Sequence, residues 1–274
     1  EGREIVIETT IDRNSVRLIL GDNQMIPLTS KHEVAILNTK GILHSEGLRT
    51  LNYTYVKRDS LENVSEYHTL IVPKGERQKV IFSDSSWVVL NAQSTMKYPV
   101  VFRGKERKVY VEGEAYFEVR HGEVPFVVRA NDAEIKVYGT KFNVRAYTEK
   151  RVAALLVEGS IGVEYRGCNV MMRPNELCRV DNINGDISTE RVDVSKYIAW
   201  TEGVFMFERD CLQDIVSELS RWYGIEIVVE SQTLQNSTIT AFFERSVSID
   251  EIMTTIEQTI NVKITKEEGR YVIR

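Results

Sequence analysis

The chain has 274 residues, 42% of them hydrophobic and 27% charged, which is the composition of a folded globular protein and excludes a disordered or collagen-like chain. Its formal net charge is −5, so composition gives no electrostatic reason to expect nucleic acid or an anionic membrane surface as a partner. The three cysteines, Cys168, Cys178 and Cys211, suit neither a full disulfide framework nor a zinc site, and whether Cys168 and Cys178 are bonded stays open.

Most of the first 200 residues predict β-strands, because apolar and polar residues alternate with period two. The clearest case is 109–119, where Val109, Val111, Ala115 and Phe117 share one face and polar residues share the other. The other strands that we expect are 17–20, 69–73, 79–82, 87–91, 126–129, 133–138, 152–158, 161–165 and 169–172.

One octet recurs within this β-rich region. Residues 111–118 and 157–164 both fit the pattern V-E-G-x-x-x-apolar-E, at an offset of 46 residues. Such an offset fits about two turns of a β-solenoid. The pattern therefore predicts a solenoid-like domain, with a β-sandwich as the alternative.

The periodicity changes near residue 205, where a small α+β domain is expected. Asp210 with Gln213 predicts a capping box before a first amphipathic helix, and Gly224 suits the left-handed position after it. Ser248 with Glu251 predicts a second capped helix. Strands are expected at 225–230, 238–243, 262–265 and 271–273, which makes two strand–helix–strand cycles.

These patterns divide the chain into four parts. Residues 1–68 form an N-terminal β-rich segment, 69–181 a central β domain, 182–204 a polar connecting segment and 205–274 the C-terminal α+β domain. The overall class is therefore mainly β plus α+β.

No pattern of catalytic or ligand-binding residues stands out. Glu112, Glu114 and Glu118 form a carboxylate row on the polar face of one strand, which we interpret as a solvated charged face. The four histidines lack metal-ligand spacing, and phosphate loops and serine-nucleophile motifs are absent. We expect no enzyme activity, no cofactor and no metal.

The end of the first C-terminal helix offers a candidate partner-binding site. Arg221, Trp222 and Tyr223 follow one another there, and aromatic and arginine side chains are enriched at interface hot spots. Trp222 also continues the apolar stripe of the helix, which favours a core position for it. Arg221 and Tyr223 project away from that stripe and are the better interface candidates.

Several stretches together resemble the FecR family of bacterial transmembrane anti-sigma regulators, in its Bacteroidetes-type form. The resemblance is strongest at 107–119 (RKVYVEGEAYFEV) and continues through 137–147 (VYGTKFNVRAY) and 156–160 (LVEGS). Residues 219–223 (LSRWY) resemble the C-terminal domain of that family. The match covers nearly the whole chain.

This resemblance implies a sensory function and two protein partners. The chain would be the periplasmic region of a single-pass inner-membrane protein, whose transmembrane helix and cytoplasmic segment lie outside it. Its C-terminal domain would be similar to the secretin and TonB short N-terminal domain. The implied partners are the N-terminal signalling domain of a TonB-dependent outer-membrane transporter and, through the cytoplasmic segment, an extracytoplasmic-function sigma factor.

Two other functions remain open at this stage. A β-solenoid with charged groups could be a carbohydrate-binding or carbohydrate-active protein, and a secretin-like domain could belong to a structural ring. The sequence names neither the transported cargo, a siderophore or a glycan, nor the oligomeric state, nor whether regulation inhibits or activates.

Overall fold

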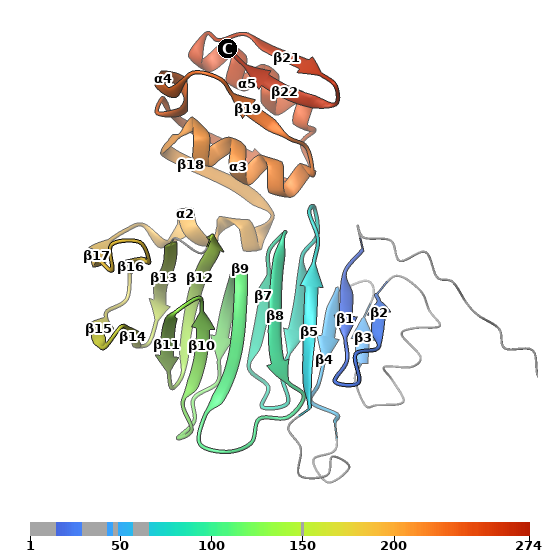
Figure 1. Ribbon diagram of the computed structural model, residues 1–274, viewed down its shortest axis with the longest axis vertical. Coiled ribbons are helices and arrows are strands. Elements are labelled where there is room, and N and C mark those ends of the chain that lie inside the picture. The colour runs from blue at the N-terminus through green and yellow to red at the C-terminus, as the bar shows by residue number, and fades with distance from the viewer. Residues whose placement is uncertain (1–14, 29–42, 46–48, 57–65, 149–150) are drawn as a thin grey trace, which may run out of the picture.

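The computed structural model of the chain describes residues 15–28, 43–45, 49–56, 66–148 and 151–274 (Figure 1). A β-rich part with seventeen strands comes first, and a small domain with both helices and strands lies over one end of it. The strands of the first part are β1 (Arg17–Ile19), β2 (Met25–Pro27), β3 (Leu43–Ser45), β4 (Thr50–Asn52), β5 (Tyr67–Val72), β6 (Gln78–Ile81), β7 (Trp87–Leu90), β8 (Ser94–Pro99), β9 (Arg107–Val119), β10 (Phe126–Ala130), β11 (Ala133–Val137), β12 (Thr140–Thr148), β13 (Arg151–Glu158), β14 (Ile161–Tyr165), β15 (Cys168–Met172), β16 (Glu176–Asp181) and β17 (Ile187–Arg191).

These strands form two sheets that share β9. Sheet A has the order β2-β1-β5-β8-β9-β10-β11-β14-β15, and sheet B has the order β3-β4-β6-β7-β9-β12-β13-β16-β17. The two sheets face each other across one apolar core, so that Phe117 of sheet B and Phe126 of sheet A lie with their ring centroids 5.9 Å apart. We call this part the sandwich.

The solenoid expected from the repeated octet is wrong. Solenoid strands stack in parallel, whereas the described sandwich strands pair antiparallel except for β9–β10 and β4–β6. From β10 onward the chain forms hairpins alternately in the two sheets: β10–β11, then β12–β13, then β14–β15, then β16–β17. The sheets do not close, and the β-sandwich alternative describes them.

The repeated octet instead marks two places where the chain passes between the sheets. Residues 107–112 of β9 pair in sheet A, residues 113–119 pair in sheet B, and Gly113 stands at the change with φ 98°. Gly159 stands between β13 of sheet B and β14 of sheet A with φ 97°. A Cβ atom at either glycine would lie within 3 Å of a neighbouring atom, so both positions require glycine.

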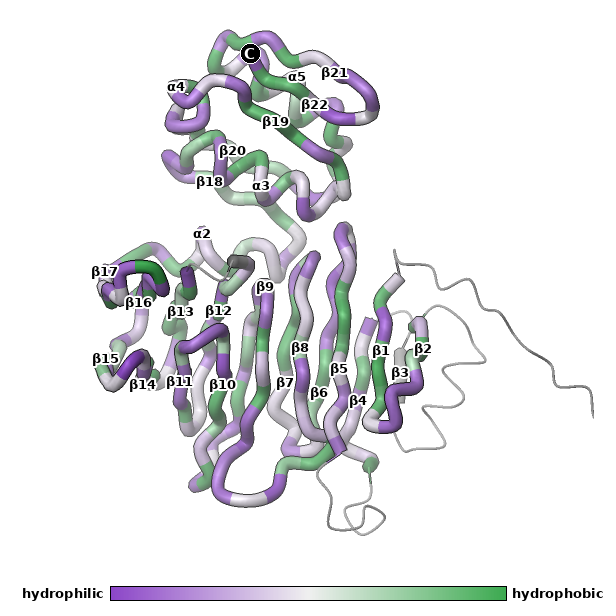
Figure 2. Tube along the Cα trace, viewed as in Figure 1, coloured by the Kyte–Doolittle hydropathy of each residue, from purple (hydrophilic) through white to green (hydrophobic). Residues whose placement is uncertain are grey.

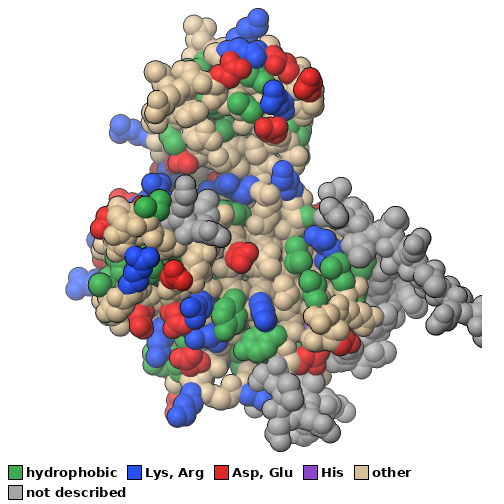
Figure 3. All heavy atoms as spheres, in the orientation of Figure 1, with side chains coloured by type: hydrophobic (Ala, Val, Ile, Leu, Met, Phe, Trp, Pro, Cys, Tyr) green, Lys and Arg blue, Asp and Glu red, His purple; other side chains and the backbone are tan. Residues whose placement is uncertain are grey.

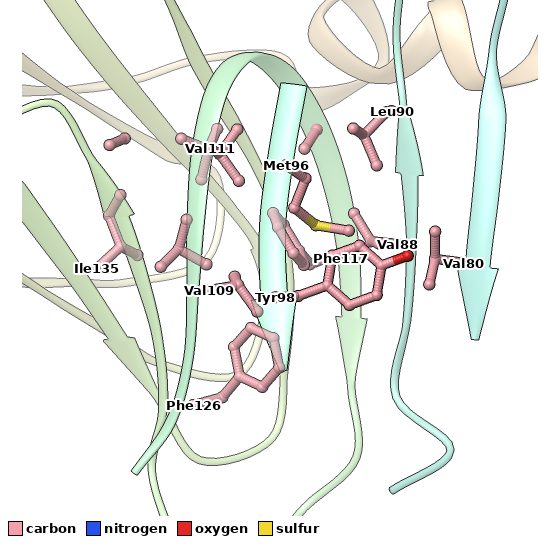
Figure 4. Close-up of a cluster of buried hydrophobic side chains, with 14 of the residues drawn as sticks. Val80, Val88, Leu90, Met96, Tyr98, Val109, Val111, Phe117, Phe126 and Ile135 are labelled. Carbon is pink, nitrogen blue, oxygen red and sulfur yellow. The ribbon is translucent and has the colours of Figure 1, made fainter. Parts of the chain in front are cut away.

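The inward faces of the two sheets build the sandwich core. The four apolar residues expected on one side of β9, namely Val109, Val111, Ala115 and Phe117, are all buried, as are the alternate residues of β5 and β6. Figure 4 shows Val80, Val88, Met96, Val109 and Phe117 converging between the sheets, and Figure 2 shows the hydropathy alternating along the strands. Burial of this apolar surface is the main driving force for folding.

The cysteines of the sandwich are not bonded to each other. Cys168 is exposed at the start of β15 in sheet A, and Cys178 is buried in β16 of sheet B. Burial raises the pKa of the Cys178 thiol to about 11. Cys211 is also a free thiol.

Two short helices connect the sandwich to the C-terminal domain. They are α2 (Val194–Ile198) and the 3-10 helix η2 (Ala199–Glu202), and they follow β17 directly. The segment 182–204, expected to be a polar connection, therefore contains a strand of sheet B as well as both helices.

The C-terminal domain contains two small sheets and two main helices. Its elements are β18 (Val204–Cys211), α3 (Leu212–Tyr223), β19 (Ile227–Val229), α4 (Gln232–Gln235), β20 (Thr238–Glu244), α5 (Ile249–Ile260), β21 (Ile264–Glu267) and β22 (Arg270–Ile273). β18 pairs with β20, and β22 lies between β19 and β21. The buried faces of α3 and α5 pack with these strands in a second apolar cluster, separate from the sandwich core.

The first helix of this domain begins later than its capping pattern predicts. Asp210 lies in β18, and α3 begins at Leu212 without a side-chain cap. The Asp210 carboxylate accepts hydrogen bonds from Lys196 Nζ (2.7 Å) and Glu208 N (2.8 Å), so one local bond and one bond to a residue 14 positions away replace the cap. The second capping box, Ser248 with Glu251, is confirmed at α5.

Candidate functional site: the joint between the two domains

The three candidate residues from the sequence lie at the end of α3 that faces the sandwich, and each has a partner within the chain. The Arg221 guanidinium lies 4.3 Å from the ring centroid of Tyr147 in β12, and burial lowers the pKa of Arg221. Trp222 Nε1 donates to the Arg245 carbonyl (3.3 Å), and the Tyr223 hydroxyl donates to the Val247 carbonyl (2.5 Å). All three side chains are half-buried. We call their surroundings, where the C-terminal domain meets the sandwich, the joint.

Arg245 is a deeply buried charge in the joint, with 4% of its side chain exposed. It follows β20, and its Nη1 donates to Asn91 Oδ1 of the sandwich (3.0 Å). Nη2 lies 3.6 Å from Glu218 Oε1, and the guanidinium lies 4.4 Å and 4.7 Å from the ring centroids of Trp222 and Phe205. Burial lowers the pKa of Arg245, and the Glu218 carboxylate opposes that shift. One side chain therefore contacts both domains.

Glu114 supplies the buried carboxylate on the sandwich side. It is 4% exposed, and its oxygens accept hydrogen bonds from Asn91 Nδ2 (2.8 Å) and Asn143 Nδ2 (3.1 Å). The interpretation of Glu112, Glu114 and Glu118 as one solvated face is wrong at Glu114. Glu112 is exposed, but β9 changes sheets between them, so Glu114 points into the joint.

One further charge, Arg145 of β12, connects the domains across the joint. Arg145 pairs in register with Glu114 across β12 and β9, and its Nη1 lies 3.7 Å from Glu218 Oε2 of α3. Burial lowers the pKa of Arg145, but the carboxylates of Glu114 and Glu218 outweigh this and raise it above its ordinary value. The Arg145 guanidinium therefore lies between a carboxylate of each domain.

The turn between β5 and β6 completes the contact. Arg77 Nη1 donates to the carbonyls of Trp200 (2.8 Å) and Thr201 (3.1 Å) in η2, and its guanidinium lies 5.9 Å from the Trp222 ring centroid. Gly75 N donates to the Arg221 carbonyl (3.2 Å). The connecting helix and the end of α3 are thus both fixed to one sandwich turn.

The joint is rich in charge but incompletely hydrogen-bonded. Within the described residues, three of its buried donors have no acceptor: Arg221 Nη2, Arg245 Nε and Trp200 Nε1. A buried donor without a partner costs free energy, and a partly satisfied polar network is worth less than a fully satisfied one. The joint therefore holds the two domains in one arrangement, but that arrangement leaves three buried donors unsatisfied.

A second feature of the C-terminal domain is an open strand edge. Among the described strands β20 pairs only with β18, and β18 also contacts α2, η2 and α3. Phe242 on β20 is 59% exposed and pairs in register with the half-buried Met206 of β18. An unpaired strand edge beside an exposed aromatic ring is a surface on which another chain can add a strand.

The described residues contain no group of three or more His, Cys, Asp or Glu side chains that could hold a metal ion. Of the helices in the described part, none combines the length and the apolar character needed to cross a membrane. The joint residues themselves comprise arginines, carboxylates, amides and aromatic rings. That set is suited to holding two domains in a defined arrangement.

Sequence reasoning found the α3 end of the joint but missed its other members. Arg245, Glu218, Arg145, Asn91 and Glu114 come from five separate segments, and only the fold brings them together. The one signal in the sequence was the octet that contains Glu114, whose glycine marks the change of sheet.

Comparison with known proteins gives two family matches and two structural relatives. The FecR protein model matches residues 68–162, and the model for the C-terminal part of FecR matches residues 204–273. Two crystal structures of a protein described as an anti-sigma factor from Parabacteroides distasonis, 33% and 32% identical, each match with a TM-score of 0.69. They cover 75% and 76% of this chain and 98% of their own chains. No curated protein matches the chain at a significant level.

Proposed function

The chain belongs to the FecR family of anti-sigma regulators, a regulatory and non-enzymatic group, and from that membership we propose that it is the sensory region of such a regulator. It lies in the periplasm as part of a single-pass inner-membrane protein. It receives a signal from the N-terminal signalling domain of a TonB-dependent outer-membrane transporter. The regulator passes that signal to an extracytoplasmic-function sigma factor through a cytoplasmic segment outside this chain.

The observation that carries the proposal is the combination of an open edge with a charged joint. The edge of β20 offers the transporter domain unpaired backbone groups beside Phe242, which suits strand addition. The joint lies on the same small domain and connects it to the sandwich through Arg145, Arg245 and Arg77. A sensor without catalytic chemistry must act by binding one arrangement better than another.

The unpaired donors of the joint support a change of arrangement on binding. Arg221, Arg245 and Trp200 each leave one buried donor without an acceptor, so this arrangement of the domains does not satisfy every group. We infer a second arrangement that satisfies these donors differently, and a partner that binds it better would shift the population toward it. In this proposal Arg221, Trp222 and Tyr223 do not contact the partner directly. They stabilise the joint whose arrangement the partner changes.

A calorimetric titration of the chain with the signalling domain of the transporter encoded beside it tests this proposal. We expect saturable binding that Phe242→Glu weakens at least tenfold, because a charge at the edge opposes docking of an apolar partner strand. Phe242 is largely exposed, so this substitution leaves the fold intact.

Tyr138→Glu is the matched control, because Tyr138 is an exposed aromatic residue of the sandwich (46%) outside the C-terminal domain. It should change the affinity less than twofold. Absence of binding in the unsubstituted chain, or equal affinities for the unsubstituted chain and Phe242→Glu, would contradict the proposal.

A further inference from the structure

The outer face of sheet A carries a groove that has no part in the joint. It has a volume of about 700 Å³ and lies over β5, β8, β9 and β10, on strands rather than on loops. Figure 3 shows hydrophobic and basic side chains gathered on this face, with acidic side chains beside them. A site built on paired strands is rigid and holds its side chains in fixed positions.

Strand register places four side chains in one row across the floor of the groove. Thr69 of β5 pairs with Lys97 of β8, Lys97 pairs with Tyr110 of β9, and Tyr110 pairs with Arg129 of β10. Neighbouring strands lie roughly 4.8 Å apart, so the row spans roughly 14 Å. This row of side chains suits an extended ligand rather than a compact one.

Two tyrosine rings lie along the groove. Tyr67 is half-buried on β5, and Tyr110 is 37% exposed on β9, with β8 between them. Lys97 Nζ of β8 lies 5.5 Å from the Tyr67 ring centroid. The two strands that carry the rings lie roughly 10 Å apart, about the length of two sugar units. The flat face of a tyrosine ring packs against the apolar C–H face of a sugar, and its hydroxyl adds a hydrogen bond.

The polar groups of the groove are available to a ligand. Within the described part of the chain, no hydrogen bond or ion pair engages the side chains of Thr69, Thr95, Tyr110 or Glu112, or the Lys97 ammonium. Arg129 has one long contact, 3.8 Å from Glu134 Oε1. Donors and acceptors therefore face the groove without serving the fold.

We propose that this groove binds an acidic oligosaccharide. Tyr67 and Tyr110 stack on sugar rings, Lys97 and Arg129 pair with carboxylates of the ligand, and Glu112 and Thr95 accept hydrogen bonds from sugar hydroxyls. The side chains that line the groove comprise two cations and one carboxylate, with Glu134 beside Arg129 just outside the lining, whereas the whole chain is at −5. An acidic chain would not attract a polyanion in general, so such binding requires a local site.

Affinity electrophoresis in gels that contain polygalacturonate, with dextran gels as the neutral comparison, tests the proposal on the full chain. We expect polygalacturonate to slow the chain and dextran to slow it far less. Tyr110→Ala and Lys97→Glu should each weaken the apparent affinity at least tenfold. Tyr138→Ala removes a tyrosine outside the groove that is somewhat more exposed than Tyr110 (46% against 37%), and it should change the apparent affinity less than twofold.

Three outcomes would overturn the proposal. If polygalacturonate slows neither the chain nor its variants, the chain has no site for it. If it slows the chain and all of the variants equally, the site lies outside the groove. Equal affinity for poly-glutamate shows a surface for acidic peptides rather than a saccharide site. Because none of these gels contains the transporter domain, their results are independent of the relay proposed above.

Discussion

Gly113→Ala is expected to lower the free energy of unfolding of the sandwich by about 3 to 5 kcal/mol. At φ 98° an L-residue is strained, which costs about 1 to 3 kcal/mol. The added Cβ would also lie 2.4 Å from Ser94 Oγ and 2.7 Å from Ser94 Cα, so β8 would have to move. That movement disturbs the bond that the Glu114 amide donates to Ser94 Oγ (2.9 Å). Denaturant unfolding followed by circular dichroism measures the loss.

Gly104→Ala is the matched control for this substitution. Gly104 also has a positive φ, 88°, but nothing lies within 4 Å of a Cβ built there. It should therefore show the backbone strain alone, about 1 to 2 kcal/mol. Equal losses at the two glycines would mean that the close approach of β8 to β9 does not constrain the change of sheet.

Arg245→Ala is expected to destabilise the C-terminal domain by about 3 kcal/mol, because within that domain it breaks the ion pair with Glu218 and removes two cation–aromatic contacts. It also leaves Asn91 Oδ1 without the guanidinium that donates to it. We expect calorimetry to show the C-terminal domain unfolding separately and at a lower temperature than the sandwich. Arg245→Lys keeps the charge but loses the planar donors. The unfolding temperature of its C-terminal domain should lie between those of the unsubstituted chain and Arg245→Ala.

Arg179→Ala provides the comparison, because Arg179 forms an exposed ion pair with Glu190 on the surface of sheet B. Its loss should cost under about 1 kcal/mol and leave the unfolding profile unchanged. If Arg245→Ala behaved like Arg179→Ala, the joint would not couple the two domains.

The sequence predicted the strands better than their arrangement. The period-two pattern of 109–119 located β9 and all of its inward residues, because alternation reports directly which face is buried. It could not show that β9 belongs to two sheets, because Gly113 changes the pairing partner while the inward face stays buried. The repeated octet around this glycine therefore predicted a solenoid, whereas the structure has hairpins that alternate between two sheets.

The joint shows the same limit for the candidate site. Arg221 and Trp222 were identified because aromatic and arginine residues cluster at one helix end, a feature local in sequence. The partner of Arg245 at Asn91 is 154 residues away, and no local pattern reports such a contact. Asp210 fails as a cap for the same reason, because its partner Lys196 precedes it by 14 residues in another element.

Hydrogen–deuterium exchange of the chain, with and without the transporter signalling domain, tests the central claim most directly. The claim is that the partner binds the C-terminal domain and that the joint carries the effect to the sandwich. We predict slower exchange across β20, a changed rate in β12 around Arg145, and no change in β14 and β15. Protection confined to the sandwich, or protection of β20 with β12 unchanged, would contradict the account.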